Sequence, residues 1–335
     1  IFKYSIYMSL VEKRKIAFCG SDEIALPMLE SICSLGQNIQ ITAILTQPDR
    51  RSGRGRKLNQ NPIKLWGSRK NLEIRSPLKP GMDEIEWLQE MGADLILVMA
   101  YGHLLSEQFL SLAPRGCYNM HASLLPRYRG ASPIETSLAC GDKTTGVTLM
   151  RMVRQMDAGP IVDQESVSID NDETGPSLRK KLGEGCVPLI QRNLSDLLFG
   201  KVQQTEQLDD QVTYCRKLEK SDAFLDFSLS AELLACRSRA FASWPGSIFV
   251  HDDICLRVGA CEALSIERLL PGEVEITENN DFRIGTGKGS LRILEVQKPG
   301  GRMLPASDFL RGYSISNGSK LSSSSGRPLV SKVFN

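Results

Sequence analysis

Two polar residues stand at the end of a very apolar stretch, spaced so that they can act on the same group. The segment CYNMHASLLPRYRG, residues 117–130, follows the apolar run ADLILVMAYG. Side chains alternate between the faces of a strand, so Asn119 and His121 point to one side and Met120 to the other. An amide NH2 and an imidazole N–H can both donate hydrogen bonds to one acceptor. They could equally satisfy buried backbone groups, and these residues alone leave both interpretations open.

The elements that position this pair are predicted from the apolar pattern upstream. The segment RKIAFCGSDEIALPMLESICSLG has an apolar strand, a turn at Gly20 and Ser21, and then apolar residues at helical spacing. Further elements are expected as strands at 39–49, 72–78 and 93–102 and a helix at 83–92 that stops at Gly92. This alternation predicts an α/β fold with a doubly wound, mostly parallel sheet, in which ligands bind beyond the carboxyl ends of the strands.

The second half of the chain predicts a hairpin, a long helix and a separate β-rich domain. Strands at 144–153 and 159–169 enclose the turn RQMDAG, and a helix is expected from Thr174, as its N-cap, to Leu198. The later short strands with glycine-rich turns suggest a small barrel. The expected organisation is an N-terminal extension at 1–13, with Met8 as the expected natural start, a catalytic domain at 14–199, a linker at 200–212, a β-barrel domain at 213–313 and a disordered Ser-rich tail at 314–335.

Composition narrows the class of protein. The chain has 335 residues and a net charge of +2, so affinity for a polyanion must come from local clusters of charge. Its nine cysteines include no CxxC pair, which argues against a structural zinc site and a secreted disulfide framework. No apolar run approaches the roughly 20 residues that span a bilayer. We therefore expect a cytoplasmic protein in a reducing compartment, without a metal.

A longer motif decides between the interpretations of Asn119 and His121. The segments NMHASLLPRYRGASPI and TGVTLMRMVRQMDAGPI resemble the signature of the folate-dependent formyltransferases, Asn-x-His-x-SLLP followed by D-x-G. The matching positions are Asn119, His121, Ser123 to Pro126, Asp157 and Gly159. No element of the pattern is missing, and three catalytic positions in order make the match specific.

The resemblance implies a fold and a chemistry. The fold is a Rossmann-like formyltransferase domain followed by a small OB-like β-barrel. The formyl donor is 10-formyltetrahydrofolate, used as a cosubstrate. The catalytic residues implied are Asn119, His121 and Asp157, and the folate-binding residues implied are Ser123, Leu124, Leu125 and Pro126.

A basic segment after the second strand suggests a nucleic-acid substrate. In DRRSGRGRK, five basic residues surround two glycines: Arg50, Arg51, Arg54, Arg56 and Lys57. A solvated loop would look the same, but flexible backbone with guanidinium groups also suits recognition of RNA phosphates. This insertion and the second domain resemble the family members that act on initiator methionyl-tRNA, over roughly residues 14–312. Ser243, where a proline is common, and the Ser-rich tail depart from that pattern.

Two alternatives remain open at this point. The chain could be another formylfolate-dependent transferase or hydrolase with the same fold. It could also be a non-catalytic RNA-binding protein that uses the barrel and the basic segment. The intact Asn119, His121 and Asp157 favour an enzyme, which we expect to act as a monomer.

Overall fold

The computed structural model describes residues 13–36, 38–52 and 57–333. Contacts group the chain into two compact units that alternate along the sequence. Unit 1 holds the described residues up to His121, with Val147–Glu165 and Leu182–Gln207. Unit 2 holds Ala122–Gly146, Ser166–Lys181 and the described residues from Leu208 onward. The contiguous domain boundaries expected from the sequence therefore stay a prediction, and each unit is described by itself.

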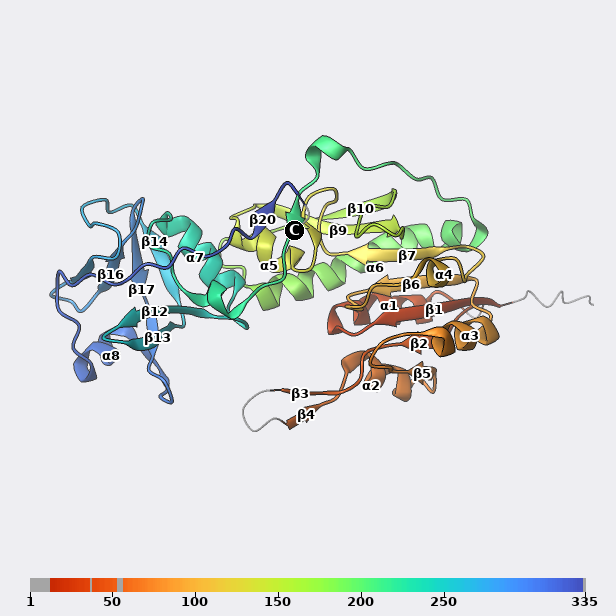
Figure 1. Cartoon of the computed structure of the whole chain (residues 1–335), viewed down its shortest axis with the longest axis horizontal. Coiled ribbons are helices and arrows are strands. Elements are labelled where there is room, and N and C mark those ends of the chain that lie inside the picture. Colours follow the sequence, from red (N-terminus) through yellow and green to blue (C-terminus); the bar gives the residue numbers. More distant parts are fainter. Residues whose placement is uncertain (1–12, 37, 53–56, 334–335) are drawn as a thin grey trace, which may run out of the picture. The chain divides into compact units, whose positions relative to one another are not determined.

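A seven-stranded sheet forms the centre of unit 1. Figure 1 shows its strands in the order β10-β9-β7-β6-β1-β2-β5, from the top of the view downward. Their bounds are β1 Arg14–Gly20, β2 Ile39–Leu45, β5 Glu73–Arg75, β6 Leu95–Met99, β7 Cys117–His121, β9 Thr144–Arg151 and β10 Ile161–Ser168. The pairs from β5 to β7 are parallel, and β9 pairs antiparallel with β7. The predicted mostly parallel sheet is confirmed.

Helices cover both faces of this sheet. The helices are α1 Leu26–Ser34, α2 Pro62–Arg69, α3 Met82–Met91, α4 Glu107–Leu110 and the part of α6 Gly175–Phe199 from Leu182 onward. One face packs against α3 and α4 through a buried cluster that includes Val98 and Cys117. On the opposite face, Gly67 of α2 lies against the side chain of Ile44. The predicted stop of α3 is also observed, because Gly92 adopts a left-handed conformation with φ 63°.

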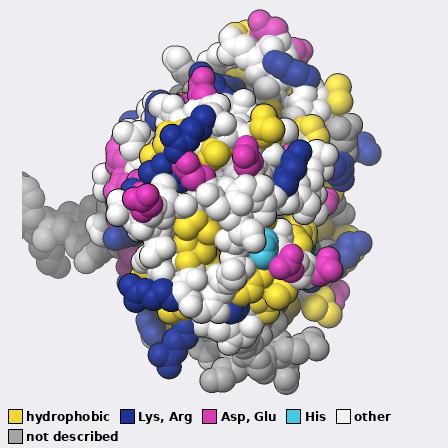
Figure 2. Space-filling view, turned by 90° about the vertical axis from the view of Figure 1, so that its left-hand side faces the viewer, with side chains coloured by type: hydrophobic (Ala, Val, Ile, Leu, Met, Phe, Trp, Pro, Cys, Tyr) yellow, Lys and Arg dark blue, Asp and Glu magenta, His cyan; other side chains and the backbone are white. Residues whose placement is uncertain are grey.

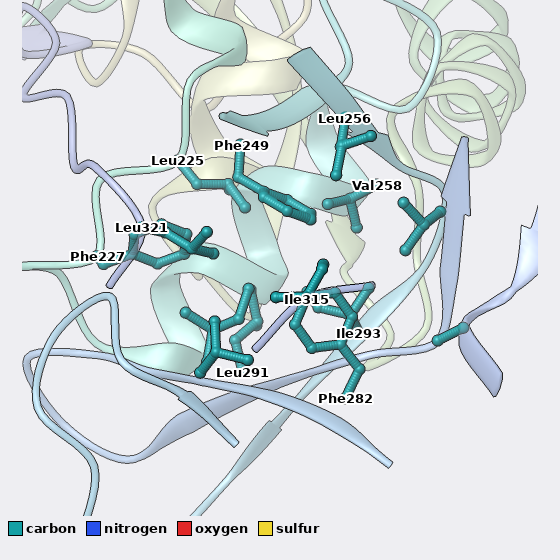
Figure 3. Close-up of a cluster of buried hydrophobic side chains, with 14 of the residues drawn as sticks. Leu225, Phe227, Phe249, Leu256, Val258, Phe282, Leu291, Ile293, Ile315 and Leu321 are labelled. Atoms are coloured by element: carbon teal, nitrogen blue, oxygen red, sulfur yellow. The ribbon is translucent and has the colours of Figure 1, made fainter. Parts of the chain in front are cut away.

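Unit 2 contains a small barrel-like domain of antiparallel strands. Its two four-stranded sheets have the orders β12-β13-β18-β19 and β14-β17-β16-β15. The strands are β12 Ser247–His251, β13 Ile254–Val258, β14 Cys261–Leu264, β15 Val274–Ile276, β16 Phe282–Gly285, β17 Ser290–Ile293, β18 Glu295–Gln297 and β19 Met303–Pro305. Unit 2 also includes α5 Pro133–Ala139, α7 Ala231–Ala240 and α8 Ala306–Gly312. Figure 3 shows the core of this domain, where Phe249 and Phe282 meet edge to face.

The C-terminal tail differs from the disorder expected for it. Ile315 and Leu321 are buried in the same core and are labelled among its side chains in Figure 3. Further along, β20 Val330–Ser331 pairs antiparallel with β11 Tyr214–Cys215, which also pairs with β8 Arg129–Gly130. The serine-rich composition suggested a solvated chain. Ile315 and Leu321 instead pack into the core, and Val330 and Ser331 pair with an available strand edge.

Candidate active site

Strand β7 presents the Asn119 and His121 pair as the sequence predicts. All five residues of Cys117–His121 are buried, and the strand lies between β6 and β9. Asn119 is opposite Val98 of β6, and His121 is opposite Thr148 of β9. Asn119 is 9% exposed and His121 is 6% exposed. Both polar side chains therefore come from the same rigid strand and keep only a small part of their surface accessible.

A buried hydroxyl lies next to His121 in the sheet. Thr148, its partner across the strands, is fully buried and accepts a hydrogen bond of 2.8 Å at Oγ1 from Nε2 of Gln164 on β10. The polar surroundings of His121 therefore extend over three neighbouring strands. Neither Thr148 nor Gln164 stands out in the sequence, because both fall inside ordinary strand patterns.

Asp157 comes from the connection between β9 and β10 and approaches His121. The distance from its Oδ2 to Nδ1 of His121 is 3.7 Å, and the two side chains are 15% and 7% exposed. This separation is too long for a direct hydrogen bond but suits an ion pair between a carboxylate and a protonated imidazole. The arrangement brings a carboxylate close to a strand that carries two hydrogen-bond donors.

The turn that carries Asp157 has a demanding backbone. Asp157 has φ 50°, a left-handed conformation that Asp adopts more readily than most residues other than Gly. Two residues later, a Cβ on Gly159 would lie 1.8 Å from the carbonyl oxygen of Arg151. The D-x-G pattern therefore has a steric origin, because the turn folds directly against the end of β9.

Gln207 is a buried polar residue that the sequence did not single out. Its Nε2 donates hydrogen bonds of 2.8 Å to the carbonyl oxygens of Asp157 and Gly159, and the residue is 9% exposed. In the sequence it falls in the polar stretch KVQQTEQLDDQV, interpreted as a linker. Nothing in that composition distinguishes it from its neighbours, so only the tertiary contacts identify it.

The segment Ser123–Pro126 forms a tight turn directly after β7 and is described with unit 2. Ser123 is fully buried, and its Oγ donates a 2.7 Å hydrogen bond to the carbonyl of Arg127. The carbonyl oxygens of Leu124 and Pro126 accept backbone hydrogen bonds from Arg127 and Thr213. The Leu125–Pro126 peptide bond is cis. These contacts define the shape of the turn, and its assignment as a folate site stays a prediction.

The basic segment begins and ends as a two-stranded hairpin. Strand β3 Arg50–Ser52, which includes Arg51, pairs antiparallel with β4 Lys57–Asn59. Arg54 and Arg56 lie outside the described residues, and Arg50 is exposed.

The base of this hairpin is tied to helix α2. Asn61 caps the helix and donates to the carbonyl of Gln47, while Asp49 accepts from Asn61 N and pairs with Lys64. The insertion therefore starts from a rigid base.

Basic side chains of unit 2 lie among acidic ones. Figure 2 shows Lys and Arg interspersed with Asp and Glu on the face it draws. Within the barrel-like domain, Arg283 pairs with Glu275 and Asp281, and Arg292 pairs with Asp281 and Glu262. The charges of Arg283 and Arg292 are thus balanced by neighbouring carboxylates.

The other two histidines have structural surroundings. His103 packs edge-on against the ring of Tyr101 at 5.1 Å between centroids, and burial followed by the charge of Arg50 lowers the pKa of His103. His251 Nδ1 lies 3.0 Å from the hydroxyl of Tyr313. Across residues 13–36, 38–52 and 57–333, no three His, Cys, Asp or Glu side chains gather in a way that could hold a metal ion. In those same ranges, every helix is too short or too polar to cross a membrane.

Comparison with protein families finds two matches that follow one another along the chain. Residues 14–188 match the family described as "Formyl transferase", and residues 217–314 match "Formyl transferase, C-terminal domain". Among curated proteins, the methionyl-tRNA formyltransferase of Methylococcus capsulatus is 38% identical over 306 residues, which are 90% of this chain and 97% of that protein. The methionyl-tRNA formyltransferase of Thermotoga neapolitana is 37% identical over 308 residues, covering 92% and 98%.

Solved structures with the same fold are more distant in sequence. An N-formyltransferase from Helicobacter canadensis, in complex with folinic acid and dTDP-3-aminofucose, superposes with a TM-score of 0.65 at 17% identity, covering 85% of this chain and 100% of that one. HypX from Aquifex aeolicus in complex with tetrahydrofolic acid gives a TM-score of 0.56 at 17% identity, covering 88% and 46%. At this identity the likeness concerns the fold.

Proposed function

Since the chain belongs to the methionyl-tRNA formyltransferase family, we propose that it transfers the formyl group of 10-formyltetrahydrofolate to the α-amino group of methionine on initiator tRNA. The product is formylmethionyl-tRNA for translation initiation. The observation that carries the assignment of the site is the paired Asn119 and His121 on β7, with Asp157 3.7 Å from His121. We also propose that the protein acts in the cytoplasm as a monomer.

The donors at the end of β7 suit the charge that develops in this reaction. The methionine amine attacks the formyl carbon, and the carbonyl oxygen gains negative charge as the new C–N bond forms. An amide NH2 from Asn119 and an N–H from protonated His121 would both be directed at that oxygen. Preorganised donors on a buried strand stabilise such charge without having to reorient during the reaction. The donor set therefore fits a formyl oxygen.

Asp157 supports the same step in a second way. Its carboxylate lies 3.7 Å from Nδ1 of His121, where it can orient the imidazole ring. The attacking amine must lose a proton, and the folate nitrogen whose bond to the formyl carbon breaks must gain one. Asp157 can accept the first proton, directly or through water, and return it to the leaving nitrogen. The side chain of Asp157 is 15% exposed, so water can reach it and carry the proton.

The turn after β7 is proposed to hold the folate. Backbone groups of Ser123, Leu124, Leu125 and Pro126 would meet the polar edge of the pterin, and leucine side chains would pack on its ring. Support for this comes from the defined shape of the turn, which Ser123 Oγ and the carbonyls of Leu124 and Pro126 maintain by hydrogen bonds. A turn held in this way loses little conformational entropy on binding.

The basic hairpin is proposed to contact the acceptor end of the tRNA. The residues concerned are Arg50, Arg51, Arg54, Arg56 and Lys57. Support comes from the anchored base of the insertion at Asn61 and Asp49 and from the concentration of positive charge in a chain of net charge +2. Recognition would then depend on a local cluster of charge and not on the field of the whole molecule.

A formylation assay tests the function directly. The purified protein would be given 10-formyltetrahydrofolate with one of four acceptors: methionyl initiator tRNA, uncharged initiator tRNA, free methionine or glycinamide ribonucleotide. We expect formyl transfer to the charged initiator tRNA and to none of the others. Faster transfer to a small amine would reassign the chain to another formyl transfer reaction. Binding of tRNA without any turnover would make it an RNA-binding protein.

A further inference from the structure

The turn that carries Asp157, between β9 and β10, is held by the side chain of Gln207, which lies outside this hairpin. Gln207 donates from Nε2 to the carbonyl oxygens of both Asp157 and Gly159, each at 2.8 Å. A primary amide has two N–H groups at a fixed angle, so one planar group joins two carbonyls that lie two residues apart. Gln207 is 9% exposed, so water competes little for these donors.

Backbone pairing places Gln207 at this turn. Ile161, at the start of β10, exchanges two 2.8 Å hydrogen bonds with Thr205 in an antiparallel bridge. Two residues beyond this bridge on each segment are Gly159 and Gln207. The turn leaves the strand at this point, so the backbone carbonyls of the turn need new hydrogen-bond donors. The side chain of Gln207 supplies them next to the backbone bridge.

The turn needs such support because its geometry is unusual. Asp157 adopts a left-handed backbone with φ 50°, and Gly159 packs against Arg151 without space for a Cβ. A non-glycine residue in this region costs free energy and persists only when its surroundings hold it there. The carboxylate on this backbone must in turn reach Nδ1 of His121, at 3.7 Å.

We infer that Gln207 is a positioning residue for the reaction, which holds the Asp157 turn so that its carboxylate faces His121. This inference rests on the proposed role of Asp157. Gln207 touches no reacting atom and acts only through that turn. Catalytic groups need their supporting contacts because a misplacement of about 1 Å can cost 100-fold in rate.

The test uses variants of the full chain. Gln207→Met keeps the length of the side chain and removes both donors, and Gln207→Asn keeps the donors but shortens their reach. We expect Gln207→Met to lower kcat about tenfold or more, with less than a twofold change in KM for either substrate. Gln204→Met is the matched control, since Gln204 lies in the same segment and its Nε2 approaches the hydroxyl of Tyr118 at 3.4 Å. The control should keep normal kcat.

A double-mutant cycle separates positioning from general stability. If Gln207 acts through Asp157, Gln207→Met should change the residual kcat by less than about twofold once Asp157→Asn is present. An equal loss in both backgrounds would overturn the inference, and so would normal kcat for Gln207→Met. If thermal unfolding shows that Gln207→Met folds poorly, the same cycle is measured with Gln207→Asn, and that result decides whether the inference stands. Normal kcat for Asp157→Asn alone would instead overturn the proposed role of Asp157, and with it this inference.

Discussion

Oδ2 of Asp157 lies 3.7 Å from Nδ1 of His121, and the two side chains come from different parts of the sheet. His121 ends strand β7, whereas Asp157 follows β9, the strand that pairs antiparallel with β7. Arg151, the last residue of β9, pairs with Tyr118 near the start of β7, so it is the connection after β9 that brings the carboxylate back to His121. In the proposed reaction, Asp157 would then accept a proton close to the site proposed for the oxyanion.

The first prediction concerns this group of three residues. Asn119→Ala and His121→Ala should each lower turnover by about 100-fold or more, because each removes a donor to the developing oxyanion. Asp157→Asn should have a similar effect, since it keeps the shape and removes the charge. Initial rates with charged tRNA, together with tRNA affinity, would be measured. Asp170→Asn, in a surface ion pair with Lys181, is the control and should be normal. Near-normal turnover of a folded His121→Ala would reject the assignment.

The second prediction concerns the glycine of the D-x-G turn. A Cβ at Gly159 would meet the carbonyl oxygen of Arg151 at 1.8 Å, so Gly159→Ala must displace the turn. We expect a loss of about 1–3 kcal/mol in the free energy of unfolding, typical of overpacking, and a fall in kcat of at least tenfold. Gly312→Ala, where a Cβ meets nothing within 4 Å, serves as the control. Wild-type stability and rate for Gly159→Ala would show that the turn adapts freely.

The third prediction concerns the C-terminal tail. A chain that ends at Leu321 loses the β20 pairing and the hydroxyl of Ser323, which donates to Asp226 and accepts from the backbone N–H of Phe227. It also loses two backbone carbonyls that accept hydrogen bonds from Arg216. We expect the free energy of unfolding to fall by about 1–3 kcal/mol, the cost of unmet polar groups. Urea unfolding would measure it. A chain that ends at Lys332 keeps β20 and should be as stable as the full chain. If the chain that ends at Leu321 is equally stable, the segment after Leu321 contributes nothing to stability.

The fourth prediction is a pH dependence of stability. The side chain of Asp222 is 1% exposed and accepts two hydrogen bonds from Arg216. Burial raises the pKa of Asp222, but hydrogen bonds from Arg216 and from the backbone of Glu219, with the charge of Arg216, outweigh it and leave the pKa below its usual value. Because the pKa of Asp222 is lower in the folded state than in the unfolded state, its charged form stabilises the fold at pH values above the unfolded pKa of about 3.9. That stability is lost as the pH falls through the folded pKa.

Asp222→Asn reveals this contribution. At pH 7 the variant should be less stable than the wild type by roughly 1.5–3 kcal/mol, the range for hydrogen bonds to charged groups. The difference should shrink as the pH falls below about 3.9, where the carboxylate of the unfolded wild type becomes protonated, and should vanish below the lower pKa of the folded state. Denaturant unfolding at several pH values would follow it. If the difference in the free energy of unfolding stays constant down to the lowest pH measured, the charge of Asp222 does not stabilise this contact.

The fifth prediction concerns the basic hairpin. Arg54→Ala and Arg50→Ala should weaken use of tRNA while leaving folate binding intact. If each arginine neutralises one phosphate, its removal should flatten the plot of log affinity against log salt by roughly 0.7 to 0.9. Arg54→Lys should restore little if bidentate or stacked geometry matters. Arg69→Ala is the control, because Arg69, like Arg50, is exposed but lies at the end of α2. An unchanged salt slope for both hairpin variants would exclude these residues as phosphate contacts.

Local patterns in the sequence were enough to predict the α/β order, the strand that carries Asn119 and His121, and the hairpin around Asp157, while the D-x-G pattern came from the family resemblance. Alternation along β7 decides which side chains share a face, and the requirement for glycine at 159 follows from the conformation of one turn. Such signals can be interpreted without knowledge of the partner segments, because the constraint acts within a few residues.

Which distant segments meet could be learned only from the folded chain. Gln207 lies in a polar stretch that resembles a linker, and the bridge between Ile161 and Thr205 brings its amide to the Asp157 turn. The serine-rich tail likewise resembles solvated chain, yet β20 adds to β11 and Leu321 enters the core. Composition reports the average preference of a segment for water. Whether that segment is ordered depends on the strand edges and buried partners that the rest of the fold offers it.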